Sequence, residues 1–194
     1  GDVSEFNRWL SEDLESAHAV EEVTGRTALT EAAAGGHTEI MSLLLRVPGI
    51  DINHADAVGD TALTLSSVCG YEACVKLLLG VTGIDINHAN MWGMTALMGA
   101  AIKGHLSIVR LLLKAPGIDI TLCSESGHTA RDHALSKGHA QVVLAIDSSS
   151  NEALELPDTP APLVLAGQGS ASGTAPVTRH RCSPCRGCAT AGWR

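Results

Sequence analysis

One phrase occurs twice in this chain and constrains its fold more than any other feature. Residues 49–56 are GIDINHAD, and residues 83–90, 34 positions later, are GIDINHAN. The match extends into longer segments that begin at Gly25, Gly59, Gly93 and Gly127, the last of which stops early. Starts at a constant interval of 34 residues indicate an array of stacked units rather than one globule.

Each unit has the pattern of two short helices and a loop. A threonine stands where its hydroxyl can cap a first helix, small residues follow, and a glycine ends that helix. Leucine, isoleucine and valine then recur on one face of a second helix. The threonines are Thr27, Thr61, Thr95 and Thr129, and the glycines are Gly36, Gly70, Gly104 and Gly138. Helices of about eight or nine residues are marginal alone, so each unit must stack on the next.

The composition fits a core of thin layers. Only five residues are aromatic, so leucine, isoleucine, valine and alanine must fill the interior. Equivalent loops carry Ile50 with Ile52, Ile84 with Ile86, and Ile118 with Ile120. We expect these pairs to form a continuous apolar seam.

The repeated letters resemble the ankyrin repeat. They are G-x-T-A-L, A-A-x-x-G-H, L-L-L and G-I-D-I-N, and they cover residues 25–146 as three full units and a partial fourth. A tetratricopeptide array has a similar period, but its interfaces are aromatic. The resemblance implies an all-α solenoid of helix–turn–helix units with loop fingers. The T-P-L-H box of the family is TALT, TALT, TALM and TARD here, so we expect weaker local hydrogen bonding.

The two ends depart from the full repeat. Residues 1–24 are expected to form a partial N-terminal repeat or a cap, because Gly1–Leu10 match the second-helix phrase. The fourth unit lacks the leucine triplet and is either a C-terminal cap or a decaying end. Residues 147–194 are rich in serine, proline, glycine and alanine and are predicted to be a disordered tail.

Charge and cysteine usage limit the classes of partner and compartment. Residues 1–147 contain 18 acidic and 9 basic residues, which argues against binding to nucleic acid. No apolar run approaches the roughly 18–20 residues that span a bilayer, and no secretory signal is visible. The six cysteines do not form the pattern of a disulfide framework. We expect a reduced intracellular protein, cytoplasmic or also nuclear, without membrane contact.

No motif points to catalysis or to a cofactor. His54 and His88 lie in neighbouring units, whose helices pack about 8–10 Å apart, too far to share zinc at about 2.1 Å. The resemblance implies that the histidines bond to loop carbonyl groups. Four residues near the C-terminus could hold a metal, although a disordered tail is the preferred interpretation: His180, Cys182, Cys185 and Cys188.

Two asparagines resemble a known modification site. Asn53 and Asn87 occupy equivalent positions in a D-I-N context. This context resembles the ankyrin site that asparaginyl hydroxylases modify. The alternative is a structural asparagine that bonds its own turn.

The remaining candidate is a protein-binding surface. The resemblance implies that partners bind at the finger tips and the exposed face of the first helices. The predicted partner-binding residues are Arg26, Val58, Asp60, Met91, Trp92, Met94 and His128. Tryptophan is a typical interface hot spot, so Trp92 is the leading candidate unless it folds onto the neighbouring finger.

We therefore predict a monomeric, non-catalytic module that binds a protein partner. The alternative is the regulatory or substrate-recruiting ankyrin segment of a larger enzyme or channel, truncated before residue 1.

Overall fold

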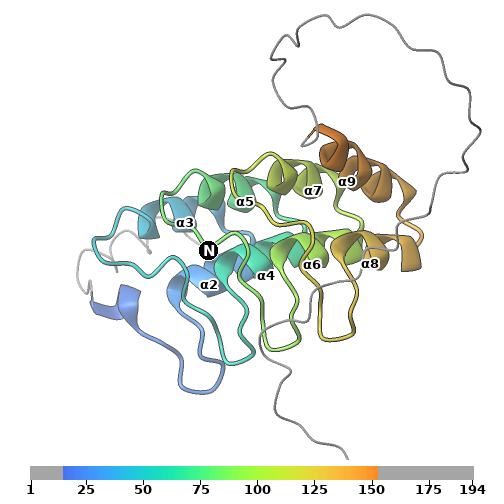
Figure 1. Ribbon diagram of the computed structural model, residues 1–194. Coiled ribbons are helices and arrows are strands. Elements are labelled where there is room, and N and C mark those ends of the chain that lie inside the picture. Colours follow the sequence, from blue (N-terminus) through green and yellow to red (C-terminus); the bar gives the residue numbers. More distant parts are fainter. Residues whose placement is uncertain (1–14, 153–194) are drawn as a thin grey trace, which may run out of the picture.

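The computed structural model describes residues 15–152, which form one row of helical pairs (Figure 1). A short 3-10 helix, η1 (Glu15–His18), comes first. The first helices of the pairs, here called the inner helices, are α2 (Ala28–Gly35), α4 (Ala62–Cys69), α6 (Ala96–Lys103) and α8 (Ala130–Ser136). The second helices, here called the outer helices, are α3 (Thr38–Leu44), α5 (Glu72–Leu79), α7 (Leu106–Leu113) and α9 (Ala140–Glu152).

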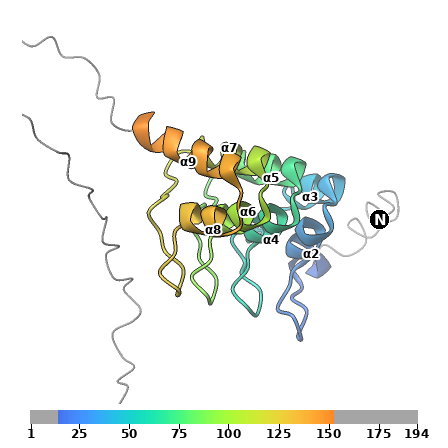
Figure 2. The same cartoon turned by 90° about the vertical axis from the view of Figure 1, so that its right-hand side faces the viewer.

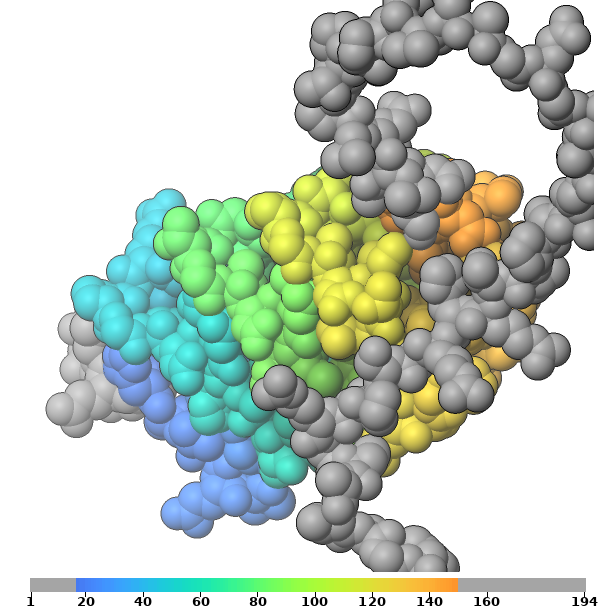
Figure 3. Space-filling model, in the orientation of Figure 1, coloured from blue at the N-terminus to red at the C-terminus, as the bar shows by residue number. Residues whose placement is uncertain are grey.

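Inner and outer helices form two layers, and a loop finger precedes each inner helix. Each inner helix contacts the next inner helix, and each outer helix contacts the next outer helix. The fingers, defined here as residues 17–27, 51–61, 85–95 and 119–129, extend from the inner layer in one direction (Figure 2). In the space-filling view successive parts of the chain form adjacent bands whose colours run from blue to orange (Figure 3). The predicted all-α solenoid is confirmed, and the described residues contain isolated bridges but no strand.

The predicted helix boundaries are confirmed by their caps. Each repeated threonine precedes an inner helix, and its hydroxyl accepts from the N–H three residues later. Gly36, Gly70 and Gly104 end the first three inner helices in the left-handed conformation. The expected weakening of the threonine box is wrong at two positions, since the side chains of Thr30 and Asp132 accept a hydrogen bond from the N–H of the N-cap residue.

The core lies between the two layers and runs continuously through the units. The first three inner helices contribute buried leucines together with small side chains, and the outer helices contribute large side chains such as Leu44, Val75 and Leu112, each completely buried. The paired loop isoleucines pack against this cluster, which confirms the predicted seam. The buried residues of all units form one cluster, so stability depends on the interfaces between units as well as on packing within each unit.

The C-terminal boundary of the repeat domain was predicted too early. Helix α9 continues through Asp147 to Glu152, although the tail was predicted to begin at residue 147. Asp147 is held by Arg131, with Nε–Oδ1 and Nη2–Oδ2 distances of 2.6 and 3.0 Å. The Ser148 hydroxyl donates to the Leu144 carbonyl at 2.8 Å, which satisfies a polar group in a serine-rich turn. The second-helix phrase of Gly1–Leu10 and the cysteine cluster of the tail lie outside the described residues.

Candidate functional site

The finger tips are fixed by side chains that bond their own turn. Asp56 accepts from the N–H groups of Val58 and Asp60 at 3.1 and 2.9 Å. Asn90, the equivalent residue of the third finger, accepts from Trp92 and Met94, each at 3.0 Å. A short side chain at the same position therefore sets the shape of both fingers.

Main-chain hydrogen bonds also join the fingers to one another. Ala57 N–H donates to the Thr24 carbonyl at 2.9 Å, and Met91 N–H donates to the Val58 carbonyl at 3.1 Å. Glu125 N–H donates to the Trp92 carbonyl at 3.0 Å. The tips consequently form one linked row, in which a side chain on one finger has a fixed position relative to the next.

Met91 and Trp92 stand on this row with large exposed side chains. Met91 is 58% exposed and Trp92 is 49% exposed. Val58 on the second finger is partly buried, and its carbonyl accepts the main-chain hydrogen bond from Met91. Met94 was predicted at the same surface, but it is partly buried and packs against the core. The structure therefore brings Val58, Met91 and Trp92 together at the tips and places Met94 beneath them.

Two predicted charged residues bond neighbouring fingers. Arg26 forms ion pairs with Glu31 at 3.0 Å and with Asp56 at 3.3 Å. The hydrogen bond to Glu31, followed by the one to Asp56, raises the pKa of Arg26. Asp60 accepts from the Asn90 carboxamide at 2.9 Å, and burial raises the pKa of this carboxyl group above its ordinary value. Both side chains thus have structural partners within the finger row.

A histidine of the fourth finger lies beside a histidine of inner helix α8. His128 is exposed, its Nδ1 lies 2.9 Å from the Ser126 hydroxyl, and its ring centre is 5.5 Å from that of His133. Burial lowers the pKa of His133, and the neighbouring His128 lowers it further. The side chain of His133 lies 3.2 Å from the Ser124 hydroxyl. Sequence reasoning found His128 but missed His133, because only the fold brings the inner helix beside the finger.

The repeated histidines link one unit to the next. The Nε2 atoms of His54 and His88 lie 2.8 and 3.1 Å from the carbonyls of Gly25 and Gly59. Two further histidines bond the last turn of the inner helix of the preceding unit. The Nε2 atom of His105 lies 3.1 Å from the Val68 carbonyl, and that of His139 lies 3.0 Å from the Ile102 carbonyl. The structural interpretation is confirmed for these four. The acceptors of His105 and His139 are helix carbonyls rather than the loop carbonyls that were expected.

Asn53 and Asn87 also bridge units, which corrects one interpretation. The carboxamide of Asn53 donates to the Gly83 carbonyl and accepts from Asp85 N–H, each at 2.8 Å. Asn87 makes the same two bonds to the following loop, at 2.7 and 2.9 Å. The interpretation that these side chains bond their own turn is wrong. The nearby aspartates do so, as the Asp51 carboxylate accepts from Asn53 N–H at 3.0 Å.

The inner helices present little accessible surface in the middle of the array. All residues from Ala62 to Ser67 in α4 are buried, as are all residues from Ala96 to Ala101 in α6. A partner that approaches the inner layer of these units therefore meets the fingers more than the inner helices.

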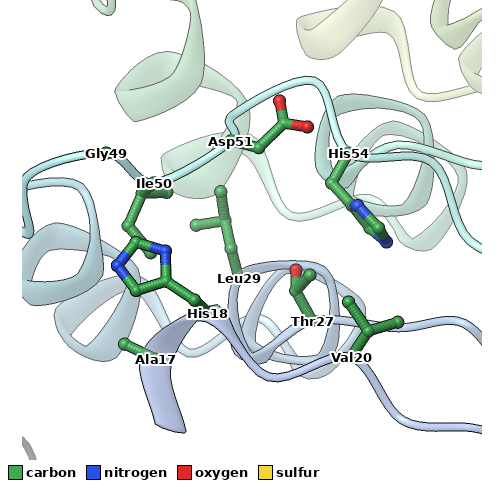
Figure 4. Close-up of a pocket in the computed structure, with 9 residues that line it drawn as sticks. All are labelled: Ala17, His18, Val20, Thr27, Leu29, Gly49, Ile50, Asp51 and His54. Atoms are coloured by element: carbon green, nitrogen blue, oxygen red, sulfur yellow. The ribbon is translucent and has the colours of Figure 1, made fainter. Parts of the chain in front are cut away.

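A small pocket lies at the N-terminal end of the described residues. It has a volume of about 80 Å³ and lies between η1, the start of α2 and the second finger (Figure 4). Its lining residues are Ala17, His18, Val20, Thr27, Leu29, Gly49, Ile50, Asp51 and His54. A water molecule occupies about 30 Å³ of liquid, so this volume fits a few waters rather than a ligand of substrate size.

Residues 15–152 contain neither a cluster of metal ligands nor a membrane-spanning helix. No group of three histidine, cysteine or acidic residues there is arranged to hold a metal ion. None of the described helices combines the length and the apolar character needed to cross a bilayer.

Comparison with protein families agrees with the repeated architecture. A family model described as ankyrin repeats (3 copies) matches residues 3–90. A second, described as ankyrin repeats (many copies), matches residues 81–134. A search of curated proteins gave no significant match. Ankyrin repeats are generally protein–protein interaction modules and are generally non-catalytic. The 34-residue units with their paired helices and linked fingers, together with both matches, show that this chain belongs to the ankyrin repeat family.

Proposed function

We propose that this chain is a non-catalytic module that binds a protein partner on its finger tips, with the third finger as the main contact. The observation that carries the proposal is the exposure of Met91 and Trp92 on a row of tips that hydrogen bonds hold in place. Large apolar side chains on a fixed backbone can be buried by a partner with little loss of conformational entropy. Tryptophan and methionine are also enriched at the centres of protein interfaces.

We expect the concave face to contribute less surface to the partner than the finger tips contribute. Helices α4 and α6 expose mainly their last residues, Cys69 and Lys103. The partner would therefore meet the fingers first and the ends of the inner helices second. The acidic balance of the chain favours a protein over nucleic acid as the partner.

Partner capture by matched variants tests the proposal. Wild type, Trp92→Ala and Leu144→Ala are compared for proteins retained from a cell extract and for melting temperature. Leu144 is a suitable control because it is 59% exposed, like Trp92, but lies on outer helix α9.

The expected result is loss of one or more specific partners with Trp92→Ala only. The melting temperature should change by no more than about 2 °C, because half of the ring is already in solvent. Retained partners together with a clearly lower melting temperature would assign Trp92 a structural role and reject the proposal.

The predicted hydroxylation of Asn53 and Asn87 is a separate proposal. Both carboxamides bond the following loop, so a hydroxylase must separate two loops to reach either side chain. Mass spectrometry of the native protein checks it, since unmodified peptides at full occupancy would reject the modification.

A further inference from the structure

The finger tips carry an apolar strip that spans three fingers. Each finger places two consecutive residues at its tip, and the pairs repeat at 34-residue intervals. The apolar members, here called the tip strip, are Val23, Ala57, Val58, Met91 and Trp92. Val23 is 85% exposed, so the first finger extends the surface that Met91 and Trp92 begin. The fingers lie side by side along the lower edge of the molecule in Figure 1.

Acidic residues are the main charged residues of the fingers that carry this strip. The four fingers contain eight acidic residues and one basic residue. The acidic residues are Glu21, Glu22, Asp51, Asp56, Asp60, Asp85, Asp119 and Glu125. Glu22 and Glu125 are exposed and flank the strip at its two ends.

The single basic residue of the fingers does not offset this charge for a partner. Arg26 is engaged by Glu31 and Asp56, and Asp56 is buried. The exposed carboxylates nearest to the tip strip in the sequence are Glu21, Glu22 and Glu125, and they lie on the first and fourth fingers.

The opposite layer has a different charge balance. The outer helices with the residues that follow them, 38–48, 72–82, 106–116 and 140–150, contain three acidic and four basic residues. The excess of acidic residues is therefore concentrated on the fingers and is not spread evenly over the two sides of the molecule. A partner with positive charge is attracted to the finger side in particular.

From the apolar strip and its acidic border we propose that the fingers bind a basic amphipathic segment of a partner protein. Its apolar side chains lie on the tip strip, and its lysine or arginine side chains face the finger carboxylates. A cation can also lie over the exposed indole ring of Trp92. This inference rests on the proposed function and adds the chemistry of the partner.

Two other occupants fit the surface less well. A second copy of this chain would place acidic fingers against acidic fingers, which is unfavourable, and its outer layer has only one basic residue more than it has acidic residues. Nucleic acid is repelled by the same carboxylates.

Synthetic peptides provide a defined probe. A labelled 12-residue peptide that alternates leucine with lysine is titrated with the full chain and followed by fluorescence anisotropy. The matched peptide replaces every lysine with glutamate. The lysine peptide should bind and weaken as salt is raised, and the glutamate peptide should not bind. Equal binding of the two peptides would overturn the inference.

Variants separate the finger site from general attraction to an acidic protein. Glu22→Gln with Glu125→Gln neutralises both ends of the strip, and Glu39→Gln with Glu72→Gln makes the same charge change on the outer helices. The finger pair should lower peptide affinity by about threefold to tenfold, while the outer pair should leave it nearly unchanged. Equal losses for the two pairs would reduce the binding to non-specific attraction and reject the inference.

The inference and the proposed function fail in different ways. Trp92→Ala should weaken the lysine peptide by at least about 30-fold if the ring is an anchor. If Trp92→Ala abolishes partner capture but Glu22→Gln with Glu125→Gln does not change peptide affinity, the proposed protein-binding function is retained and the proposal of a basic partner is rejected. Sedimentation that shows a Trp92-dependent dimer would instead identify a second copy as the occupant and overturn the inference.

Discussion

A glycine inside an inner helix gives the sharpest test of how the units fit together. Gly99 lies in the middle of α6 and is buried, whereas the other inner helices have Glu31, Leu65 and His133 at this position. Glycine in a helix interior costs about 1 kcal/mol relative to alanine. On helix propensity alone, Gly99→Ala should therefore stabilise the protein.

Packing against the preceding unit predicts the opposite sign. A Cβ atom on Gly99 would lie 2.5 Å from Cγ2 of Val68 on α4, and the next nearest atom, Cβ of Val68, would be 3.8 Å away. A single methyl group must therefore move by about 1 Å. Valine in a helix strongly prefers one χ1 rotamer, so that movement costs either a rotamer change or a wider spacing of α4 and α6. Overpacking of this kind costs about 1–3 kcal/mol.

The two effects are separated by a double-mutant cycle. Gly99→Ala alone should lower the free energy of unfolding by up to about 2 kcal/mol, the overpacking cost less the gain in helix propensity. In the Val68→Ala background the same change should raise it by about 1 kcal/mol. The coupling free energy, about 1–3 kcal/mol, is the direct measure of the contact. Urea denaturation followed by circular dichroism at constant m value gives all four stabilities.

Two glycine controls keep backbone effects apart from packing. Gly80 has a φ of −81°, and its added Cβ would meet only ordinary contacts at 3.4 Å, so Gly80→Ala should be neutral or slightly stabilising. Gly117 has a φ of +82° and open space around it, so Gly117→Ala should cost about 1 kcal/mol in either Val68 background. If Gly99→Ala changes stability equally with and without Val68, the contact between the units does not control the result and the reasoning is wrong.

Three further predictions address polar contacts. Asn87→Ala should lower the free energy of unfolding by about 1–3 kcal/mol because two hydrogen bonds between loops are lost. Ala19→Asn, at the equivalent position of the first finger, should raise the free energy of unfolding. Urea denaturation measures both changes. Burial raises the pKa of Asp60, so ionisation of this carboxyl group opposes folding once the pH rises through its unfolded-state pKa. Asp60→Asn should therefore stabilise the protein at pH 7, and the gain should vanish below about pH 4, as thermal melts across pH will show. Arg131→Leu should promote self-association in sedimentation, because Leu135 beside it on α8 is already 61% exposed, whereas Arg131→Gln should not.

The features that could be predicted from the sequence depend on residues of one unit and recur in each unit. The threonine N-caps and the glycine helix ends depend on a few neighbouring residues, and the 34-residue interval shows the same choice several times. The features that it missed join residues of different units. Asn53 bonds a loop 30 residues away, and Val68 covers Gly99, yet neither partner can be identified from the letters of one unit. Exposure of Trp92 likewise depends on the neighbouring finger.

The fourth unit shows why a sequence pattern could not choose between a cap and a decaying end. Arg131 stands where the first three inner helices have buried leucines, and Asp147 stands where their outer segments have Leu45, Leu79 and Leu113. Each substitution alone resembles a lost repeat. In the structure the two charged side chains form a bidentate ion pair, while Val142 and Ile146 remain buried against the preceding unit. The fourth unit is therefore apolar toward its neighbour and carries an ion pair on its outer side, which is the charge pattern of a capping repeat, although Leu135 beside Arg131 is exposed.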